Sequence, residues 1–386
     1  MPLLGPVCLS SYLNQRGIKA DFIDFNNQPS SLEESVSRLA EYKVAGFTCF
    51  KSNFKNVLLV ANALRKKQKS IKIIFGGPEI SRVFFLGKGK FSSEITKLAD
   101  ILVMGEGEKP LFEILSKKNI KSGLFFKNHQ LENLEELPEF RYKGIDFNNY
   151  NSFGAIPFEF SRGCIRARNF CAERLLFKGY RIRPAEAVIN EIAFYRKYKG
   201  LKRAVFFDSM LNADIRLFEK LCDALIRQFG GFPWEAQIAI RPDMEIKLLK
   251  KMKSSGCYNL FIGLESGSDN TLKKMRKGFT AREASNFFEK LSQTGLHFGV
   301  SMIVNYPGET EEDFKESLDF LIRNKEFIPK IEQVNPFAYY EGTNLSENYD
   351  YREDSNGIRR FEEFKSVIKK HGFKYTNAFL GNLIEK

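Results

Sequence analysis

Residues 155–173 read AIPFEFSRGCIRARNFCAE, an apolar run followed by a polar loop that contains Cys164 and Cys171. Five more strand-like runs follow at intervals: RAVFFD (203–208), WEAQIAI (234–240), NLFIGLE (259–265), HFGVSMIV (297–304) and IEQVNPF (331–337). Helical patterns separate these runs, and one of them begins with a capping box made by Thr280 and Glu283. Six strand–helix units in series predict a partial (βα)6 barrel of the TIM type, whose chemistry belongs on the loops after the strands.

A second alternation of apolar runs and helical patterns precedes this one. Its strand-like runs are ADFIDF (20–25), VAGFTC (44–49), IKIIF (71–75) and ILVM (101–104). They predict a doubly wound parallel α/β sheet, which binds ligands outside the carboxyl ends of its strands. Two glycine-bearing loops fall at such ends, Gly76-Gly77-Pro78 and Gly105-Glu106-Gly107-Glu108. Glycine there allows a flat ligand to approach the backbone, but a tight turn into a helix explains the loops equally well.

Turn residues and acidic side chains predict a linker over 128–152, which divides the chain into domains at 1–127 and 153–340 and an extension at 341–386. We expect an amphipathic helix near 358–371 in that extension. Apolar residues make up 43% of the 386 residues and charged residues 28%, which is a globular composition. No apolar run reaches the roughly 18 residues of a membrane span, and no basic leader is seen, so we expect a cytoplasmic protein.

The net charge of +13 would suit an acidic partner such as RNA. Lys and Arg recur along the whole chain, however, which favours ordinary surface charge and makes an RNA-associated factor the weakest hypothesis. Of the six cysteines, only Cys164 and Cys171 share a polar loop. Thiolates are the usual ligands of iron–sulfur clusters, but two thiols are an incomplete site. The residues alone therefore leave open a metal site and a structural or redox pair.

Taken together, the motifs resemble the radical S-adenosylmethionine (SAM) family, in the branch with an N-terminal cobalamin-binding domain. The resemblance is carried by the GGP and GEGE loops, SRGC with NFC, FFDS, GLESGSDNTLKKMRKG and YPGETEEDF. It implies a three-cysteine loop that holds a 4Fe-4S cluster, whose fourth iron is chelated by the amino and carboxylate groups of SAM. An external electron donor reduces the cluster, and cleavage of SAM then yields a 5'-deoxyadenosyl radical. The outcome would be radical methylation or rearrangement of a small-molecule or lipid-like substrate.

Matching residue by residue, Cys164 and Cys171 correspond to the first and third cluster ligands, whereas the middle position is Arg168. A guanidinium stays protonated and cannot be a ligand. The resemblance also implies a set of SAM contacts: Phe170, Ile303 and Pro307 on the adenine side, Asp208 and Ser209 at the amino end, Arg241 at the carboxylate, and Glu265 and Ser266 at the methionine or ribose. Each of these side chains could instead pack, cap a helix or pair locally. No catalytic residue is assigned.

Cobalamin contacts are implied by resemblance at Thr48, Gly76, Gly77 and Gly105. The chain begins late relative to the family, so we expect the first strand of that domain to be missing and corrinoid binding to be weakened. Asn305 stands where the family has glycine; we expect it to tolerate left-handed backbone and to crowd the adenine. The leading hypothesis is a radical SAM enzyme with an incomplete cluster motif. The alternative is a non-catalytic, degenerate SAM- and corrinoid-binding protein.

Overall fold

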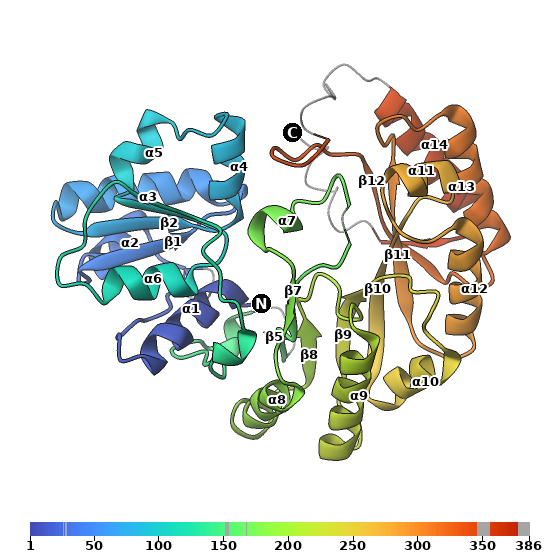
Figure 1. Ribbon diagram of the computed structural model, residues 1–386, viewed down its shortest axis with the longest axis horizontal. Coiled ribbons are helices and arrows are strands. Elements are labelled where there is room, and N and C mark those ends of the chain that lie inside the picture. Colours follow the sequence, from blue (N-terminus) through green and yellow to red (C-terminus); the bar gives the residue numbers. More distant parts are fainter. Residues whose placement is uncertain (26, 28, 151–153, 167, 346–355, 377–386) are drawn as a thin grey trace. The chain divides into compact units, whose positions relative to one another are not determined.

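The computed structural model describes residues 1–25, 27, 29–150, 154–166, 168–345 and 356–376, which form two compact units (Figure 1). The first unit comprises 1–157, 172–201 and 341–343. The second comprises 158–171, 202–340 and the described residues from 344 onward.

The first unit is built around a parallel sheet with strands in the order β1-β2-β3-β4. In chain order its elements are α1 (Leu4–Gln15), α2 (Leu32–Leu39), β1 (Val44–Thr48), α3 (Phe54–Lys67), β2 (Lys72–Gly76), α4 (Pro78–Leu86), α5 (Ser93–Leu98), β3 (Ile101–Met104), α6 (Glu108–Leu115) and β4 (Leu124–Lys127). After them come η1 (Leu134–Glu136), η2 (Phe147–Asn149), α7 (Glu173–Leu176), β7 (Tyr180–Ile182) and α8 (Ala185–Lys199).

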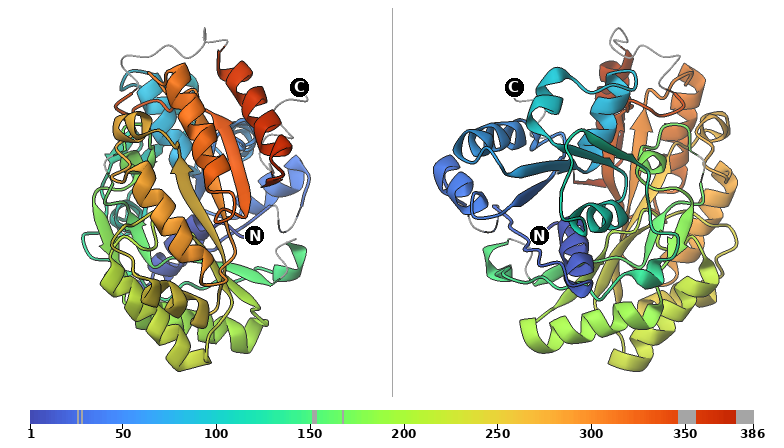
Figure 2. Two further views of the ribbon diagram at one scale, coloured as in Figure 1. Left: turned by 90° about the vertical axis from the view of Figure 1, so that its right-hand side faces the viewer. Right: turned by 60° about the vertical axis from the view of Figure 1, so that its left-hand side comes forward.

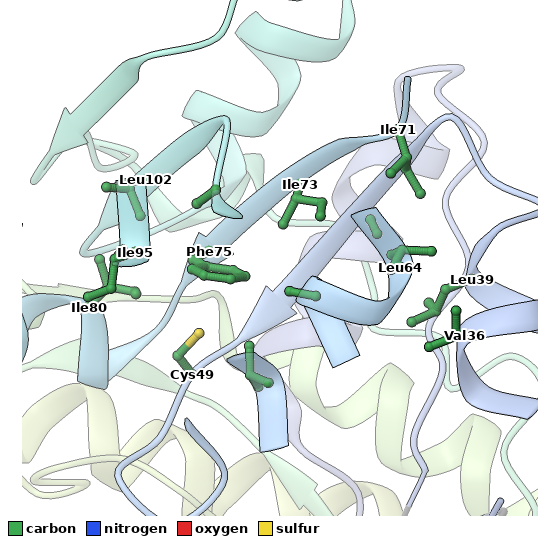
Figure 3. Close-up of a cluster of buried hydrophobic side chains, with 14 residues drawn as sticks. Val36, Leu39, Cys49, Leu64, Ile71, Ile73, Phe75, Ile80, Ile95 and Leu102 are labelled. Atoms are coloured by element: carbon green, nitrogen blue, oxygen red, sulfur yellow. The ribbon is translucent and has the colours of Figure 1, made fainter. Parts of the chain in front are cut away.

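Helices cover both faces of this sheet, as expected for a parallel α/β domain. On one face, Ile73 and Phe75 of β2 pack against α2, α3 and α5 through Leu39, Leu64 and Ile95 (Figure 3). On the other face, buried side chains of β2 and β3 pack against α6. The sheet core is therefore closed on both sides, which leaves the strand ends as the place for a ligand.

The run ADFIDF (20–25) is not a strand, contrary to the prediction. The side chain of Asn14 takes the place of a neighbouring strand: its Nδ2 donates to the carbonyl of Ala20 at 2.6 Å and its Oδ1 accepts from the Ala20 N–H at 3.4 Å. Because a side chain satisfies both backbone groups of Ala20, the apolar–polar alternation alone did not suffice to place the segment in the sheet.

The second unit contains a curved parallel sheet in the order β13-β12-β11-β10-β9-β8-β5 (Figure 2). Its elements are β5 (Ala155–Phe158), β6 (Ser161–Gly163), β8 (Arg203–Phe206), α9 (Ile215–Phe229), β9 (Trp234–Ile238), α10 (Ile246–Ser254), β10 (Cys257–Glu265), α11 (Asp269–Lys274), α12 (Ala281–Ser292), β11 (Phe298–Val304), α13 (Glu311–Arg323), β12 (Lys330–Pro336), α14 (Asn356–Lys370) and β13 (Lys374–Tyr375). All six predicted strands are confirmed, and so is the capping box of Thr280 and Glu283 at the start of α12.

The predicted C-terminal helix is confirmed as α14, which packs against β11, β12 and α13. The short strand β13 then extends the sheet beyond β12. The C-terminal stretch thus continues the barrel architecture. None of the helices in the described part of the chain is long and apolar enough to cross a membrane.

Candidate functional site

The segment 161–173, which contains Cys164 and Cys171 and is called the cysteine loop below, begins where Asp208 holds the backbone in place. This carboxylate accepts hydrogen bonds from the N–H of Phe160 at 3.2 Å, from the N–H of Ser161 and from the Ser161 hydroxyl at 2.5 Å. Burial raises the pKa of Asp208 to about 7. Asp208 therefore positions the start of the loop. It does not cap the helix that follows, which was the alternative to contact with SAM, because α9 is capped by Asp214. Ser209, beside it, is half-buried.

The two cysteines of the loop are partly exposed, and neither forms a disulfide with another described residue. The sulfur of Cys164 lies 3.9 Å from the Met210 sulfur and accepts a hydrogen bond from the N–H of Arg166 at 3.4 Å. Among the described residues, no group of three His, Cys, Asp or Glu side chains is arranged to hold a metal ion. With Arg168 between the thiols in sequence, this donor set does not fit a cluster held by three thiolates.

A segment after α11 lies directly against the cysteine loop. The Asn169 amide donates to the carbonyl of Lys274 at 3.1 Å, and the Arg166 guanidinium reaches the carbonyl of Gly278 at 3.5 Å. Arg166 also fills the space beside Gly278, since a Cβ built there would lie 1.9 Å from its Nη1. The loop is thus attached to both ends of the segment 274–278, which contains the buried Lys277.

Lys277 is a site residue that the sequence analysis missed, although it lies in the quoted motif GLESGSDNTLKKMRKG. It is 1% exposed. Its ammonium donates to the carbonyl of Gly263 at 2.9 Å and lies 3.5 Å from Oε1 of Glu265. Burial lowers its pKa to about 7, and the positive charge of Arg168 adds to this effect. The signal in the sequence was weak, because one lysine among several cations in a motif does not reveal which one is buried.

Glu265 ends β10 in a strained backbone conformation, with φ of 72° at a non-glycine residue. The register of β10 and β11 also shifts between Gly263 and Glu265. Oε2 of Glu265 accepts a hydrogen bond from the Ser301 hydroxyl at 3.0 Å. Such strain is often found at functional sites. Here it brings Glu265, Ser301 and Lys277 together at the carboxyl end of the barrel strands.

Two predicted SAM contacts already have protein partners. The guanidinium of Arg241 forms two hydrogen bonds with Asp243, at 2.9 and 2.6 Å, and donates to the carbonyl of Ala213 at 2.7 Å. Ser266 is fully buried, and its hydroxyl lies 2.8 Å from that of Ser317 on α13. Both arrangements match the local pairing that was the alternative to SAM binding.

The predicted adenine-side residues lie near a cavity of about 540 Å³. The ring of Phe170 packs edge-on against Tyr306, with ring centres 5.9 Å apart, and Ile303 belongs to the same apolar cluster. The cavity is lined by Asn169, Tyr306 and Pro307 together with Asn270, Lys273, Lys274, Arg276 and Leu345. Its volume lies in the range of small-molecule sites, roughly 300–1,000 Å³.

Asn305 has a left-handed backbone, with φ of 60°, as predicted. We expected its side chain to crowd adenine, but the side chain contacts α14 instead. The amide oxygen accepts a hydrogen bond from Arg360 of α14 at 3.3 Å, and the amide nitrogen lies close to Gly357 of the same helix. The physical reason is that Arg360 of α14 offers the amide oxygen a charged hydrogen-bond donor.

In the first unit, the predicted corrinoid contacts share one edge of the sheet. Thr48 and Gly76 are register partners at the ends of β1 and β2. Gly77 and Gly105 have φ of 94° and 88°, which glycine adopts without strain. A Cβ at Gly77 would lie 2.8 Å from the Cys49 carbonyl oxygen, so this glycine is also required by close backbone packing. Glycine here serves the turn into α4 whether or not a ligand binds.

Comparison with known proteins identifies both domains. A model of the radical SAM superfamily matches residues 158–321, and a model of the B12 binding domain matches residues 1–115. An uncharacterized methyltransferase of Pyrococcus horikoshii is 26% identical over 89% of this chain and 77% of its own length. The ribosomal protein uS12 methylthiotransferase RimO of Bacteroides fragilis is 27% identical over 49% of this chain. The match spans only 45% of that relative.

Solved structures of cobalamin-dependent enzymes share the fold. The radical SAM methyltransferase TsrM from Kitasatospora setae, with tryptophan and a SAM analogue bound, has a TM-score of 0.74 at 14% identity, covering 89% of this chain and 72% of TsrM. A second TsrM structure holds cobalamin and a [4Fe-4S] cluster. OxsB with aqua-cobalamin has a TM-score of 0.69 at 17% identity, covering 97% of this chain and 56% of OxsB.

The fold is therefore that of the cobalamin-dependent radical SAM enzymes. The chain carries a B12-binding domain followed by a radical SAM domain, and the proteins to which it is similar include methyltransferases.

Proposed function

We propose that this protein binds SAM at the carboxyl ends of its barrel strands and a corrinoid at the glycine-bearing edge of its first unit, and that it acts in methyl transfer to a small molecule. One observation carries the proposal: Glu265, Ser301 and Lys277 form a buried polar group at the strand ends, next to the cysteine loop. Buried polar groups at that position are typical of a ligand site in a barrel.

The N-terminal unit supports the corrinoid part of the proposal. Thr48 and Gly76 are the last residues of β1 and β2, and Gly105 directly follows β3, so the three lie along one edge of the sheet. That edge is where an open parallel sheet binds ligands. The proposal places the protein in the cytoplasm, where thiols such as Cys164 and Cys171 stay reduced.

A full radical reaction would use a cluster, reduced by an external electron donor, to cleave SAM and start methylation or rearrangement of the substrate. Cys164 and Cys171 with Arg168 do not fit that cluster. Arg168 therefore favours a second candidate function, a non-catalytic protein that binds SAM and corrinoid without cleaving SAM.

Anaerobic reconstitution with iron and sulfide distinguishes the radical enzyme from the non-catalytic binding protein. Wild type, Arg168→Cys and Arg227→Cys are each assayed for bound iron and for 5'-deoxyadenosine formed from SAM under reducing conditions. Arg227→Cys is the control, because it adds a thiol on an exposed position of α9. We expect only Arg168→Cys to gain about four irons and to cleave SAM.

If the wild type also cleaves SAM, the radical enzyme is the correct function. If only Arg168→Cys cleaves SAM, the SAM pocket is intact and Arg168 is what prevents cleavage in the wild type. If none of the three proteins cleaves SAM although all of them bind it, the non-catalytic function is correct. If a folded wild type binds neither SAM nor corrinoid, the proposal as a whole is wrong.

A further inference from the structure

Arg162 at the start of the cysteine loop is paired with Glu159 at 2.8 Å, whereas two further arginines of the loop, Arg166 and Arg168, have no such partner among the described residues. Arg241 is paired with Asp243, and Lys277 lies beside Glu265. Neither Arg166 nor Arg168 forms an ion pair with any residue in the described part of the chain. The Nε atoms of both arginines are buried and have no hydrogen-bond partner among the described residues. A buried guanidinium N–H without an acceptor is costly, and together with the lack of an ion pair this favours an anionic ligand as the partner of these two arginines.

The contacts of its chain neighbours place Arg168 beside the segment 274–278. The loop is attached to the segment 274–278 on both sides of Arg168, through Arg166 at Gly278 and Asn169 at Lys274. The buried ammonium of Lys277 lies in the middle of that segment and is influenced by the charge of Arg168. Arg168 therefore adds a guanidinium beside the Lys277–Glu265 pair.

A cavity next to the cysteine loop has room for the rest of such a ligand. Asn169, the residue after Arg168, lines the cavity of about 540 Å³ together with Tyr306 and Pro307. A ligand that occupies both the cavity and the space at Arg168 would have a nucleoside-sized part in the cavity and an anionic group at Arg168. SAM and S-adenosylhomocysteine have this shape, with an adenosine at one end and an α-carboxylate at the other. Guanidinium and carboxylate match as planar, bidentate partners.

We propose that Arg168 binds the α-carboxylate of SAM or S-adenosylhomocysteine, so that the amino-acid end of the ligand is held by a guanidinium of this chain and not by a metal cluster. This inference rests on the proposed function, because it needs SAM-type ligands to bind in the barrel. It makes ligand binding independent of iron. Arg168 then binds the ligand through hydrogen bonds and charge, as a cysteine ligand of a cluster could not. The cysteine loop thus retains a role in ligand binding without its middle cysteine.

The test measures binding to the metal-free protein by calorimetry. The probes are S-adenosylhomocysteine, 5'-methylthioadenosine, which lacks the amino-acid end, and inorganic phosphate. The proteins are wild type, Arg168→Ala, Arg168→Lys and, as the control, Arg227→Ala on the exposed side of α9. Circular dichroism and the thermal midpoint establish that each variant is folded.

We expect wild type to bind S-adenosylhomocysteine at least tenfold more tightly than 5'-methylthioadenosine. Arg168→Ala should remove this difference by weakening only the first ligand, Arg168→Lys should restore part of it, and Arg227→Ala should leave it unchanged. A loss of general packing would weaken both ligands alike and would overturn the inference.

Other outcomes separate this inference from the proposed function. Equal affinity of wild type for both nucleosides would overturn the role of Arg168 and leave SAM-type binding intact. Failure of wild type to bind either nucleoside would overturn the proposed function as well. Phosphate binding that depends on Arg168, without binding of S-adenosylhomocysteine, would assign the site to a free anion and contradict the carboxylate.

Discussion

Asn305 shows how a residue other than glycine is accommodated at a left-handed position. Its φ is 60°, and its amide oxygen accepts a hydrogen bond from Arg360 at 3.3 Å. Asn305→Gly should change the free energy of unfolding by less than about 1 kcal/mol, because one hydrogen bond is lost without any backbone strain. Asn305→Val should cost about 2 kcal/mol, since a β-branched residue is strained there. Urea unfolding of the three proteins checks this; equal stability of the two variants would contradict it.

Glu309 is a buried carboxyl whose titration makes stability depend on pH. It accepts hydrogen bonds from the N–H of Asn305 at 2.7 Å and from Arg360 at 3.0 Å. Burial raises its pKa from 4.5 to about 7; Asp313 adds to the rise, while the hydrogen bond from Asn305 and the charge of Arg360 oppose it. A raised folded-state pKa means that the protonated form favours folding. This contribution is complete below about pH 4.5 and is lost as the pH rises through about 7.

Glu309→Gln keeps the side-chain shape but does not titrate. Relative to this variant, the wild type should lose up to about 3 kcal/mol of unfolding free energy between about pH 4.5 and 7.5. The measurement is the free energy of unfolding of both proteins at half-unit steps of pH. Parallel curves would show that Glu309 does not titrate in this range.

At the scale of elements, the segment predicted as a linker is fixed onto α8 around residues 140–142. The Phe140 N–H donates to Glu191 at 2.8 Å, and the Tyr142 N–H donates to the Tyr195 hydroxyl at 2.9 Å. That hydroxyl in turn donates to the carbonyl of Phe140 at 2.9 Å. Glu191 is also paired with Arg183 at 2.6 Å, with both side chains fully buried.

These contacts predict different effects for two tyrosines of one helix. Tyr195→Phe leaves a buried N–H and a buried carbonyl without partners, which should cost about 2 kcal/mol. Tyr198→Phe is the control, because Tyr198 is 59% exposed and should change stability by less than about 0.5 kcal/mol. Hydrogen exchange at the Tyr142 amide should accelerate only in Tyr195→Phe. Unchanged exchange there would mean that α8 does not hold the segment.

Sequence patterns predicted the elements whose signals are local. The six barrel strands and the cap at Thr280 follow from runs and spacings of a few residues. The contacts that fix residues 140–142 join positions more than 50 residues apart, and no local pattern encodes them. The same reason hid Lys277, whose burial depends on Gly263 and Glu265 of another element. The cysteine loop and Glu265 were predictable because a motif marked them.

At the scale of the whole molecule, the two units have separate cores, and this allows the two proposed ligand sites to be tested separately. Phe75 is fully buried in the core of the first unit, beside Gly76 at the end of β2. Phe288 is fully buried in the second unit and stacks on Phe298 with ring centres 5.7 Å apart. Phe to Ala in a core costs about 3–5 kcal/mol, so each change should loosen its own unit first.

Phe75→Ala should therefore weaken aquacobalamin binding and leave S-adenosylhomocysteine binding within about twofold, because the cavity it creates lies under the sheet edge of Thr48 and Gly76 and not in the barrel. Phe288→Ala should weaken S-adenosylhomocysteine binding and leave aquacobalamin binding within about twofold, since α12 supports β11 and hence Ser301. Absorbance titration with aquacobalamin and calorimetry with S-adenosylhomocysteine, both below the unfolding temperature, measure the two affinities. If each variant lost both ligands while circular dichroism showed a folded chain, the two sites would be energetically coupled, and separate ligand sites on separate cores would be the wrong description of this protein.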